Sequence, residues 1–189
     1  VHDGSLIPYF WLSMKAYVQD NYPESLWQYT KPLGYQDKVL EEINVTKPIK
    51  QINHSLTSTV GAIRGMHYQD SPHAEIKIVR CISGEVFDVA VDLRKDSDTF
   101  LQWHGEYLSA ENSKMMVIPE GFAHGFQVIK PNSELLYFHT ESYTQKAESG
   151  VLFNDEKIGI KWPLQVTNIS DRDLKHEPIT KEFKRLNIK

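Results

Sequence analysis

Between residues 48 and 141, hydrophobic and polar residues alternate in short runs that are separated by turn-forming residues. This alternation has the period of a β-strand. It predicts strands at residues 49–55, 62–68, 75–82, 85–92, 101–108, 115–118, 123–129 and 134–141. Ser83-Gly84 separates two of these runs and predicts a tight hairpin, because glycine can adopt the positive φ that such turns need. Short strands with almost no helical periodicity between them predict an all-β sandwich or barrel.

The segments on either side of this region are less regular. Residues 11–17 and 37–44 fit either a helix or an edge strand, and the pattern does not separate the two. Near the other end, Ser170 stands three residues before Asp173 and could cap a short helix. A length of 189 residues suits one domain. We therefore expect a single domain over residues 1–189, with an N-terminal arm at 1–47, a barrel core at 48–145 and a C-terminal segment at 146–189 that completes the site.

Charge and composition argue against several classes of partner. A net charge of -4 and a pI near 6.1 give no general attraction to nucleic-acid phosphates. Pro8 and Lys15 interrupt the apolar N-terminal stretch, which is too short to span a membrane. Cys81 is the only cysteine, so no internal disulfide can form, and a reducing compartment is indicated. We expect a cytoplasmic protein that binds neither nucleic acid nor membrane.

Four polar side chains fall on the apolar faces of predicted strands, namely His67, Lys77, His124 and Tyr137. A buried lysine needs a carboxylate or a ligand anion beside it, and Glu75 is the nearest acid in the sequence. Taken singly, each of these residues is more often a satisfied core residue than a catalyst. Only their convergence in one cavity would indicate a functional site.

Seven segments between residues 48 and 174 occur in the same order in a known enzyme family. They are QINHS at 51–55, IRGMHYQ at 63–69, PHAEIKIVR at 72–80, GEVFDVAVDLR at 84–94, IPEGFAHGF at 118–126, LLYFHTESY at 135–143 and NDEKIGIKWP at 154–163. Through them the chain resembles the dTDP-4-dehydrorhamnose 3,5-epimerases. The resemblance implies a cupin barrel, which is a jelly roll or double-stranded β-helix with a few short helices. It also implies a homodimer in which N-terminal strands exchange contacts between subunits.

The family acts on nucleotide-linked 4-keto-6-deoxy sugars. The resemblance therefore implies an isomerase that inverts carbon 3, carbon 5 or both, by removing a proton beside the ketone and returning one to the opposite face. Its product would supply deoxysugar for a surface polysaccharide such as the lipopolysaccharide O-antigen. Two alternatives stay open: a non-catalytic cupin that binds nucleotide sugars, and a related reaction such as keto-group migration or metal-dependent oxygenation.

The same resemblance implies roles for individual residues. His67 would be the base that removes the proton, with Asp173 as its orienting partner. Tyr137 would be the acid on the opposite face, and Lys77 would lie near the keto oxygen. Substrate contacts are implied for Gln51, Asn53, Arg64, His124, Tyr143, Glu148 and Arg172. The chemistry is consistent with these types of residue, since a weakly acidic C–H needs both a positioned base and a stabilised enolate oxygen.

One geometric difficulty concerns Arg64 and His67, which are three residues apart. Strict alternation places their side chains on opposite faces of one strand. The resemblance nevertheless implies that both contact the substrate, and a β-bulge at Gly65 could bring both into the same cavity.

The histidine spacing disfavours a metal centre. Metal-binding cupins usually offer a His-x-His pair with a following glutamate, and a third histidine in a later Pro-x-Gly-x-x-His element. Only the later element is present, as Pro119, Gly121 and His124. The earlier site has His67 followed six residues later by His73, so a three-histidine site is disfavoured, and we expect no metal and no cofactor.

Several residues depart from the family pattern. Arg172 stands in place of a lysine, and Glu75 stands in place of a glutamine. The N-terminal segment 20–23 lacks the Arg-Gly pair that the family uses at the nucleotide diphosphate. The sequence therefore leaves the base, the sugar and the number of inverted carbons open.

Overall fold

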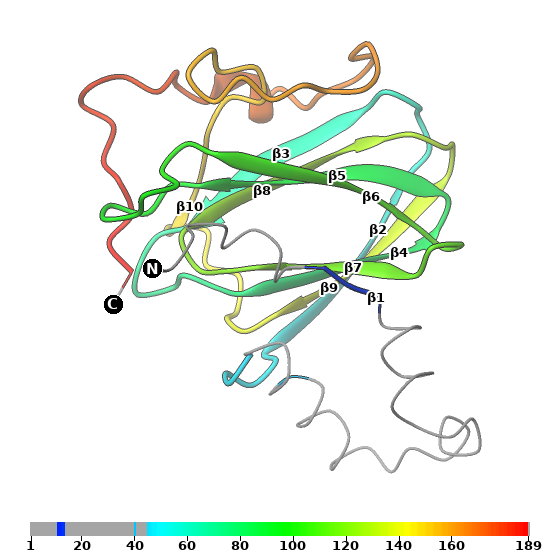
Figure 1. Ribbon diagram of the computed structural model, residues 1–189, viewed down its shortest axis with the longest axis horizontal. Helices are drawn as coiled ribbons and strands as arrows, with labels where there is room; N and C mark the ends of the chain where they lie inside the picture. Colours follow the sequence, from blue (N-terminus) through cyan, green and yellow to red (C-terminus); the bar gives the residue numbers. More distant parts are fainter. Residues whose placement is uncertain (1–10, 14–39, 41–44, 189) are drawn as a thin grey trace, which may run out of the picture.

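The computed structural model describes residues 11–13, 40 and 45–188, and it consists mainly of two antiparallel sheets that form two layers (Figure 1). The first, called here the β4 sheet, has the strand order β1-β7-β4-β9-β2. Its strands are β1 (Trp11–Ser13), β7 (Lys114–Ile118), β4 (Lys77–Ser83), β9 (Ser133–His139) and β2 (Gln51–Thr57). The second, the β8 sheet, has the order β10-β3-β8-β5-β6. Its strands are β10 (Glu148–Gly150), β3 (Ile63–Gln69), β8 (Phe122–Val128), β5 (Glu85–Asp92) and β6 (Trp103–Ser109).

The strands predicted between residues 48 and 141 are all present, and their ends differ from the prediction by no more than two residues. The prediction of an all-β jelly-roll barrel is therefore confirmed. The short helix expected after Ser170 is the 3-10 helix η3 (Asp173–Lys175). Within the uncertain stretch 11–17, β1 is an edge strand that pairs with β7. The rest of that stretch, residues 37–44 apart from Leu40, and the segment 20–23 lie outside the described residues.

The β8 sheet is buried on both faces. On β5, Val86 and Ala90 point into the space between the sheets, whereas Phe87, Val89 and Val91 pack beneath the C-terminal segment. That segment, coloured orange in Figure 1, runs over the outer face of the β8 sheet and carries η3. Double burial explains why β5 carries apolar residues on both of its faces. In the described part of the chain, no helix is long and apolar enough to cross a membrane.

Gly65 marks a break in the pairing of β3 with β8. The register shifts between Arg64 and His67, so an irregularity is present where a bulge could reconcile the alternation with the implied site. Gly65 has a φ of +124°, and a Cβ atom there would lie 2.5 Å from Cα of Gly125 on β8. Only glycine combines this backbone conformation with so close an approach of the two strands. The bulge allows Arg64 and His67 to line the same cavity.

Candidate active site

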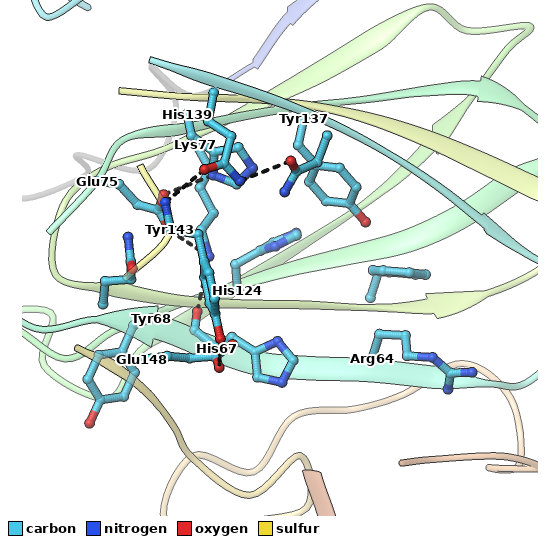
Figure 2. Close-up of a pocket in the computed structure, with 14 residues that line it drawn as sticks. Arg64, His67, Tyr68, Glu75, Lys77, His124, Tyr137, His139, Tyr143 and Glu148 are labelled. Carbon is cyan, nitrogen blue, oxygen red and sulfur yellow. Dashed lines mark hydrogen bonds and ion pairs between the residues drawn. The ribbon is translucent and has the colours of Figure 1, made fainter. Parts of the chain in front are cut away.

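Polar side chains from both sheets converge on a cavity of roughly 200 Å³ at one end of the barrel (Figure 2). Its lining residues are Gln51, Asn53, Arg64, His67, Tyr68, Gln69, Glu75, Lys77, His124, Phe126, Tyr137, His139, Tyr143 and Glu148. All the predicted site residues belong to this lining except Asp173 and Arg172, which both contact His67. The convergence that the sequence alone could not establish is therefore present.

His67 and Asp173 form a hydrogen-bonded pair although 106 positions separate them in the chain. Nε2 of His67 lies 2.7 Å from Oδ1 of Asp173, and the main-chain N–H of Gly65 donates to Oδ2 at 3.2 Å. Burial by itself raises the pKa of the Asp173 carboxyl, but the bond and charge of His67, together with the Gly65 N–H, lower that pKa to about 2. Asp173 is therefore a carboxylate that holds the proton of His67 on Nε2. The other ring nitrogen, Nδ1, makes no hydrogen bond within the described residues.

Arg172 contacts both His67 and Glu148, which lines the cavity near its entrance. Its Nη1 donates to both carboxylate oxygens of Glu148, at 3.0 and 3.1 Å. Its Nη2 lies 3.1 Å from Nε2 of His67, which already directs its proton toward Asp173. The hydroxyl of Tyr143 donates to Glu148 at 2.8 Å, and 53% of Tyr143 is exposed. An accessible aromatic ring is thus held at the entrance beside a paired cation and anion.

Tyr137 lies on β9 in the opposite wall from His67, which lies on β3. Its hydroxyl is 3.2 Å from Oγ of Ser55, and its ring packs edge-on against His124 with centroids 6.2 Å apart. Burial raises the pKa of this phenol, so it keeps its proton at neutral pH. The cavity therefore has an imidazole on one wall and a protonated phenol on the other.

Lys77 projects into the cavity from β4, and its ammonium group has two partners there. Nζ lies 3.2 Å from Oε1 of Glu75 and 3.5 Å from the main-chain oxygen of His67. The acid nearest to Lys77 in the sequence is therefore also its partner in the structure. The side chains of Lys77 and Glu75 are only 12% and 7% exposed, so the cation is held beside the base in a largely enclosed site.

His124 has a buried partner that the sequence analysis missed. Nε2 of His124 lies 2.8 Å from Oδ1 of Asp88, and Asp88 has no solvent exposure. Asp88 stands on β5 between Val86 and Ala90, which face the barrel interior. Alternation along β5 would have placed this acid inside the barrel, and a buried acid requires a partner. Among the described residues, Oδ2 of Asp88 has no hydrogen bond.

A family model described as dTDP-4-dehydrorhamnose 3,5-epimerase matches residues 33–181 of this chain. The chain belongs to this family. An epimerase of that name from Shigella flexneri is 49% identical over 142 residues, which are 75% of this chain and 78% of the relative. A structure of the Bacillus anthracis epimerase with TDP and pyrophosphate bound has a TM-score of 0.73 and 42% identity, covering 76% of this chain and 82% of that one. A Legionella pneumophila structure in complex with dTDP-4-keto-L-rhamnose has a TM-score of 0.71 and 39% identity, covering 75% of each chain.

Membership in this epimerase family makes the protein an isomerase, and it bears on one possible metal site. Among the described residues, His67, Asp173 and His176 bring three potential ligand atoms within 4.8 Å of one another. However, Asp173 already accepts the proton of His67, and the Arg172 guanidinium lies beside the same nitrogen. A metal ion would have to displace that proton next to a fixed cation. The donor set therefore fits a hydrogen-bonded histidine–aspartate pair better than a metal centre.

Proposed function

We propose that this protein epimerises a nucleotide-diphosphate-linked 4-keto-6-deoxy sugar at one or both carbons beside the ketone. The observation that carries this proposal is the placement of His67 and Tyr137 on opposite walls of one cavity. An inversion requires that one group takes a proton from one face of the sugar and that a second group supplies a proton to the other face. The names of the related structures, which hold TDP or dTDP-4-keto-L-rhamnose, support the nucleotide sugar as the substrate class.

In the proposed reaction, Nδ1 of His67 removes the proton from carbon, since Nε2 is directed toward Asp173. The electron pair of the broken C–H bond moves onto the keto oxygen, and the resulting enolate is stabilised by the ammonium group of Lys77. Asp173 stabilises the imidazolium that His67 becomes. Lys77 suits this role because its Nζ lies within 3.5 Å of the His67 main chain.

The second proton comes from Tyr137. The enolate carbon takes the phenolic proton from the face opposite His67, the ketone forms again, and the configuration of that carbon is inverted. The phenolate then regains a proton from solvent, and His67 loses its own. Because the phenol is buried and its pKa is raised, it enters each cycle protonated. We propose Gln51, Asn53, Arg64, His124, Glu148 and Arg172 as the polar contacts of the substrate, with Tyr143 stacked on the nucleobase.

Incorporation of solvent deuterium tests this mechanism directly. The protein is mixed with a dTDP-linked 4-keto-6-deoxyhexose in D₂O, and deuterium beside the ketone is followed by NMR. The His67→Asn variant should lose at least about 100-fold in exchange rate, the size expected for a general base. Tyr137→Phe should still exchange the proton that His67 removes, but it should invert the carbon far more slowly.

The matched control is His54→Asn. His54 forms a histidine–glutamate pair with Glu134 on the outer face of the β4 sheet, where 52% of its side chain is exposed. This variant should exchange deuterium at the rate of the unaltered protein. Binding of the sugar without exchange would favour the non-catalytic alternative, and a product with a migrated keto group would favour a keto-isomerase. Either result would overturn the proposal.

We also propose that the protein is a cytoplasmic homodimer that contributes a deoxysugar to a surface polysaccharide such as the O-antigen. The family membership supports the pathway. The family resemblance supports the dimer, because it implies that N-terminal strands exchange contacts between subunits. A mass near one chain by light scattering would contradict the dimer.

A further inference from the structure

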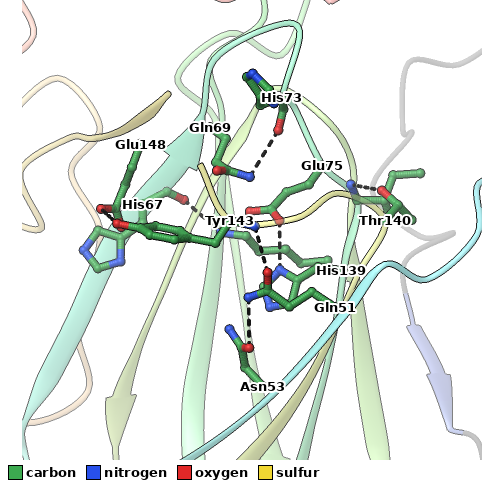
Figure 3. Close-up of polar contacts among 12 residues, drawn as sticks. Gln51, Asn53, His67, Gln69, His73, Glu75, His139, Thr140, Tyr143 and Glu148 are labelled. Carbon is green, nitrogen blue, oxygen red and sulfur yellow. Dashed lines mark hydrogen bonds and ion pairs between the residues drawn. The ribbon is translucent and has the colours of Figure 1, made fainter. Parts of the chain in front are cut away.

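Three largely enclosed side chains form a chain of contacts across one wall of the cavity, and the proposed reaction uses only the first of them, Lys77. Lys77 pairs with Oε1 of Glu75 at 3.2 Å, and Nδ1 of His139 lies 2.9 Å from Oε2 of the same carboxylate. All three line the cavity (Figure 2), and Figure 3 shows the contact between Glu75 and His139. His139 is the cross-strand neighbour of Gln51 on β2 and of Lys77 on β4. No role has so far been given to His139, nor to Glu75 beyond its pairing with Lys77.

The hydrogen bonds determine which nitrogen of His139 carries a proton. Burial raises the pKa of Glu75, but the bonds from His139 and Lys77 outweigh it and lower that pKa, so Glu75 is a carboxylate. A carboxylate only accepts hydrogen bonds, so Nδ1 of His139 must donate to it. Lys77 already neutralises the Glu75 charge, so a second buried cation on His139 would lack a counter-ion. In the neutral ring, whose proton is then on Nδ1, Nε2 carries a lone pair.

That lone pair has no partner in the described part of the chain. Nε2 of His139 is buried and unpaired, and the residue as a whole is only 8% exposed. A buried acceptor without a donor is costly, and native proteins rarely leave one unless a ligand or water satisfies it. The ring is also fixed from a second side, since it stacks on Tyr137 with centroids 6.0 Å apart and planes 22° apart. A fixed, unsatisfied acceptor therefore lies beside the proposed acid.

We propose that Nε2 of His139 accepts a hydrogen bond from a hydroxyl group of the sugar ring, and that Glu75 is the positioning residue that orients it. The inference rests on the proposed function. The sugar is the part of the substrate concerned because His139 stacks on Tyr137, which delivers the proton to the sugar. The nucleobase would instead lie at Tyr143, which is half-exposed at the entrance. The contact would select sugars that carry a hydroxyl donor at this position over deoxy analogues.

His139→Asn is the variant that isolates this contact. The asparagine amide reaches the place of Nδ1 and can still donate to Glu75, but nothing replaces Nε2. With the full keto sugar, kcat/KM for deuterium exchange beside the ketone should fall about fivefold, as for the loss of one neutral hydrogen bond. Two analogues are also tested, one without the hydroxyl at carbon 2 and one without the hydroxyl at carbon 3. For the analogue that lacks the contacted hydroxyl, His139→Asn should not lower kcat/KM. An equal loss with all three sugars would overturn the contact.

Glu75→Gln tests the positioning role and gives a second variant should the first not fold. It should lower kcat/KM when it is introduced into the unaltered protein. When it is introduced into the His139→Asn variant, the further loss of kcat/KM should be smaller, because the hydroxyl contact of His139 is already absent. An identical loss in both backgrounds would mean that Glu75 acts through Lys77 alone, and the positioning role would fail. Thymidine diphosphate binding should be unchanged in both variants, and His54→Asn is again the matched histidine control.

The failure of this inference is distinguishable from failure of the proposed function. If the unaltered protein does not exchange deuterium into any keto sugar, the epimerase proposal itself fails. If it exchanges deuterium and the His139→Asn penalty is the same for every sugar, only the hydroxyl contact is wrong.

Discussion

The two ends of the barrel are built from the same strands but have opposite characters. On β9, Leu135 is 1% exposed and packs in the apolar cluster between the sheets, whereas Tyr137 and His139 further along the same face line the cavity. On β4, Cys81 belongs to the apolar cluster and Lys77 lines the cavity. On the inward face of each strand, apolar packing residues thus give way to titratable residues within four positions of the sequence. The apolar cluster and the lining of the cavity therefore occupy different halves of the same strands.

The largest effect on folding is expected at the apolar end. Leu135→Ala should destabilise the protein by about 3 kcal/mol, because it removes buried methyl groups and leaves a cavity. Its matched partner on the same strand, Tyr137→Phe, should change stability by less than about 1 kcal/mol, since it loses only the bond to Ser55. Urea unfolding of both variants measures this difference. If the two variants lose similar amounts of unfolding free energy, the apolar end does not contribute more to stability than the end that holds the cavity.

A smaller effect is expected for Asp173→Asn, which weakens the polar end. The Asp173 pKa is about 2 in the folded protein and 3.8 in a model peptide, so its carboxylate contributes about 2 kcal/mol of stability above pH 4. A carboxyl with a lowered pKa loses this contribution as the pH falls from about 4 toward 2. Asp173→Asn should therefore be less stable than the unaltered protein at pH 7, and the gap should narrow in acid.

Urea unfolding at pH 7 and at pH 3 measures the difference in unfolding free energy between the unaltered protein and Asp173→Asn. Asp171→Asn is the control, because Asp171 is exposed two residues before Asp173. A gap that stays constant with pH would contradict the link between stability and the ionisation of Asp173.

Alternation predicted the strands well because a period of two residues is a local property of the sequence. It placed His124 and Tyr137 on inward faces, but by itself it placed Arg64 and His67 on opposite faces, and only the family resemblance implied that both line the cavity. The partnership of His67 with Asp173 was implied only by the family resemblance, because 106 positions separate the two residues. Nothing in the local pattern signals so distant a contact.

Other features of the structure were not predicted, for different physical reasons. Strand β10 is only three residues long, so it has too few positions to display a period. Asp88 could have been found, because alternation along β5 turns it inward. The bond between Glu75 and His139 could not, since it depends on the register of β4 against β9, which no single strand specifies.

The bulge at Gly65 has a consequence for anyone who wishes to transfer this chemistry to another scaffold. The N–H of Gly65 helps to hold Asp173, and the missing side chain of Gly65 lets β3 approach Gly125 closely enough to turn His67 inward. Grafting a histidine and an aspartate onto a regular strand would reproduce the residue types without their geometry. The smallest portable unit is the histidine, the aspartate and the pair of facing glycines on neighbouring strands.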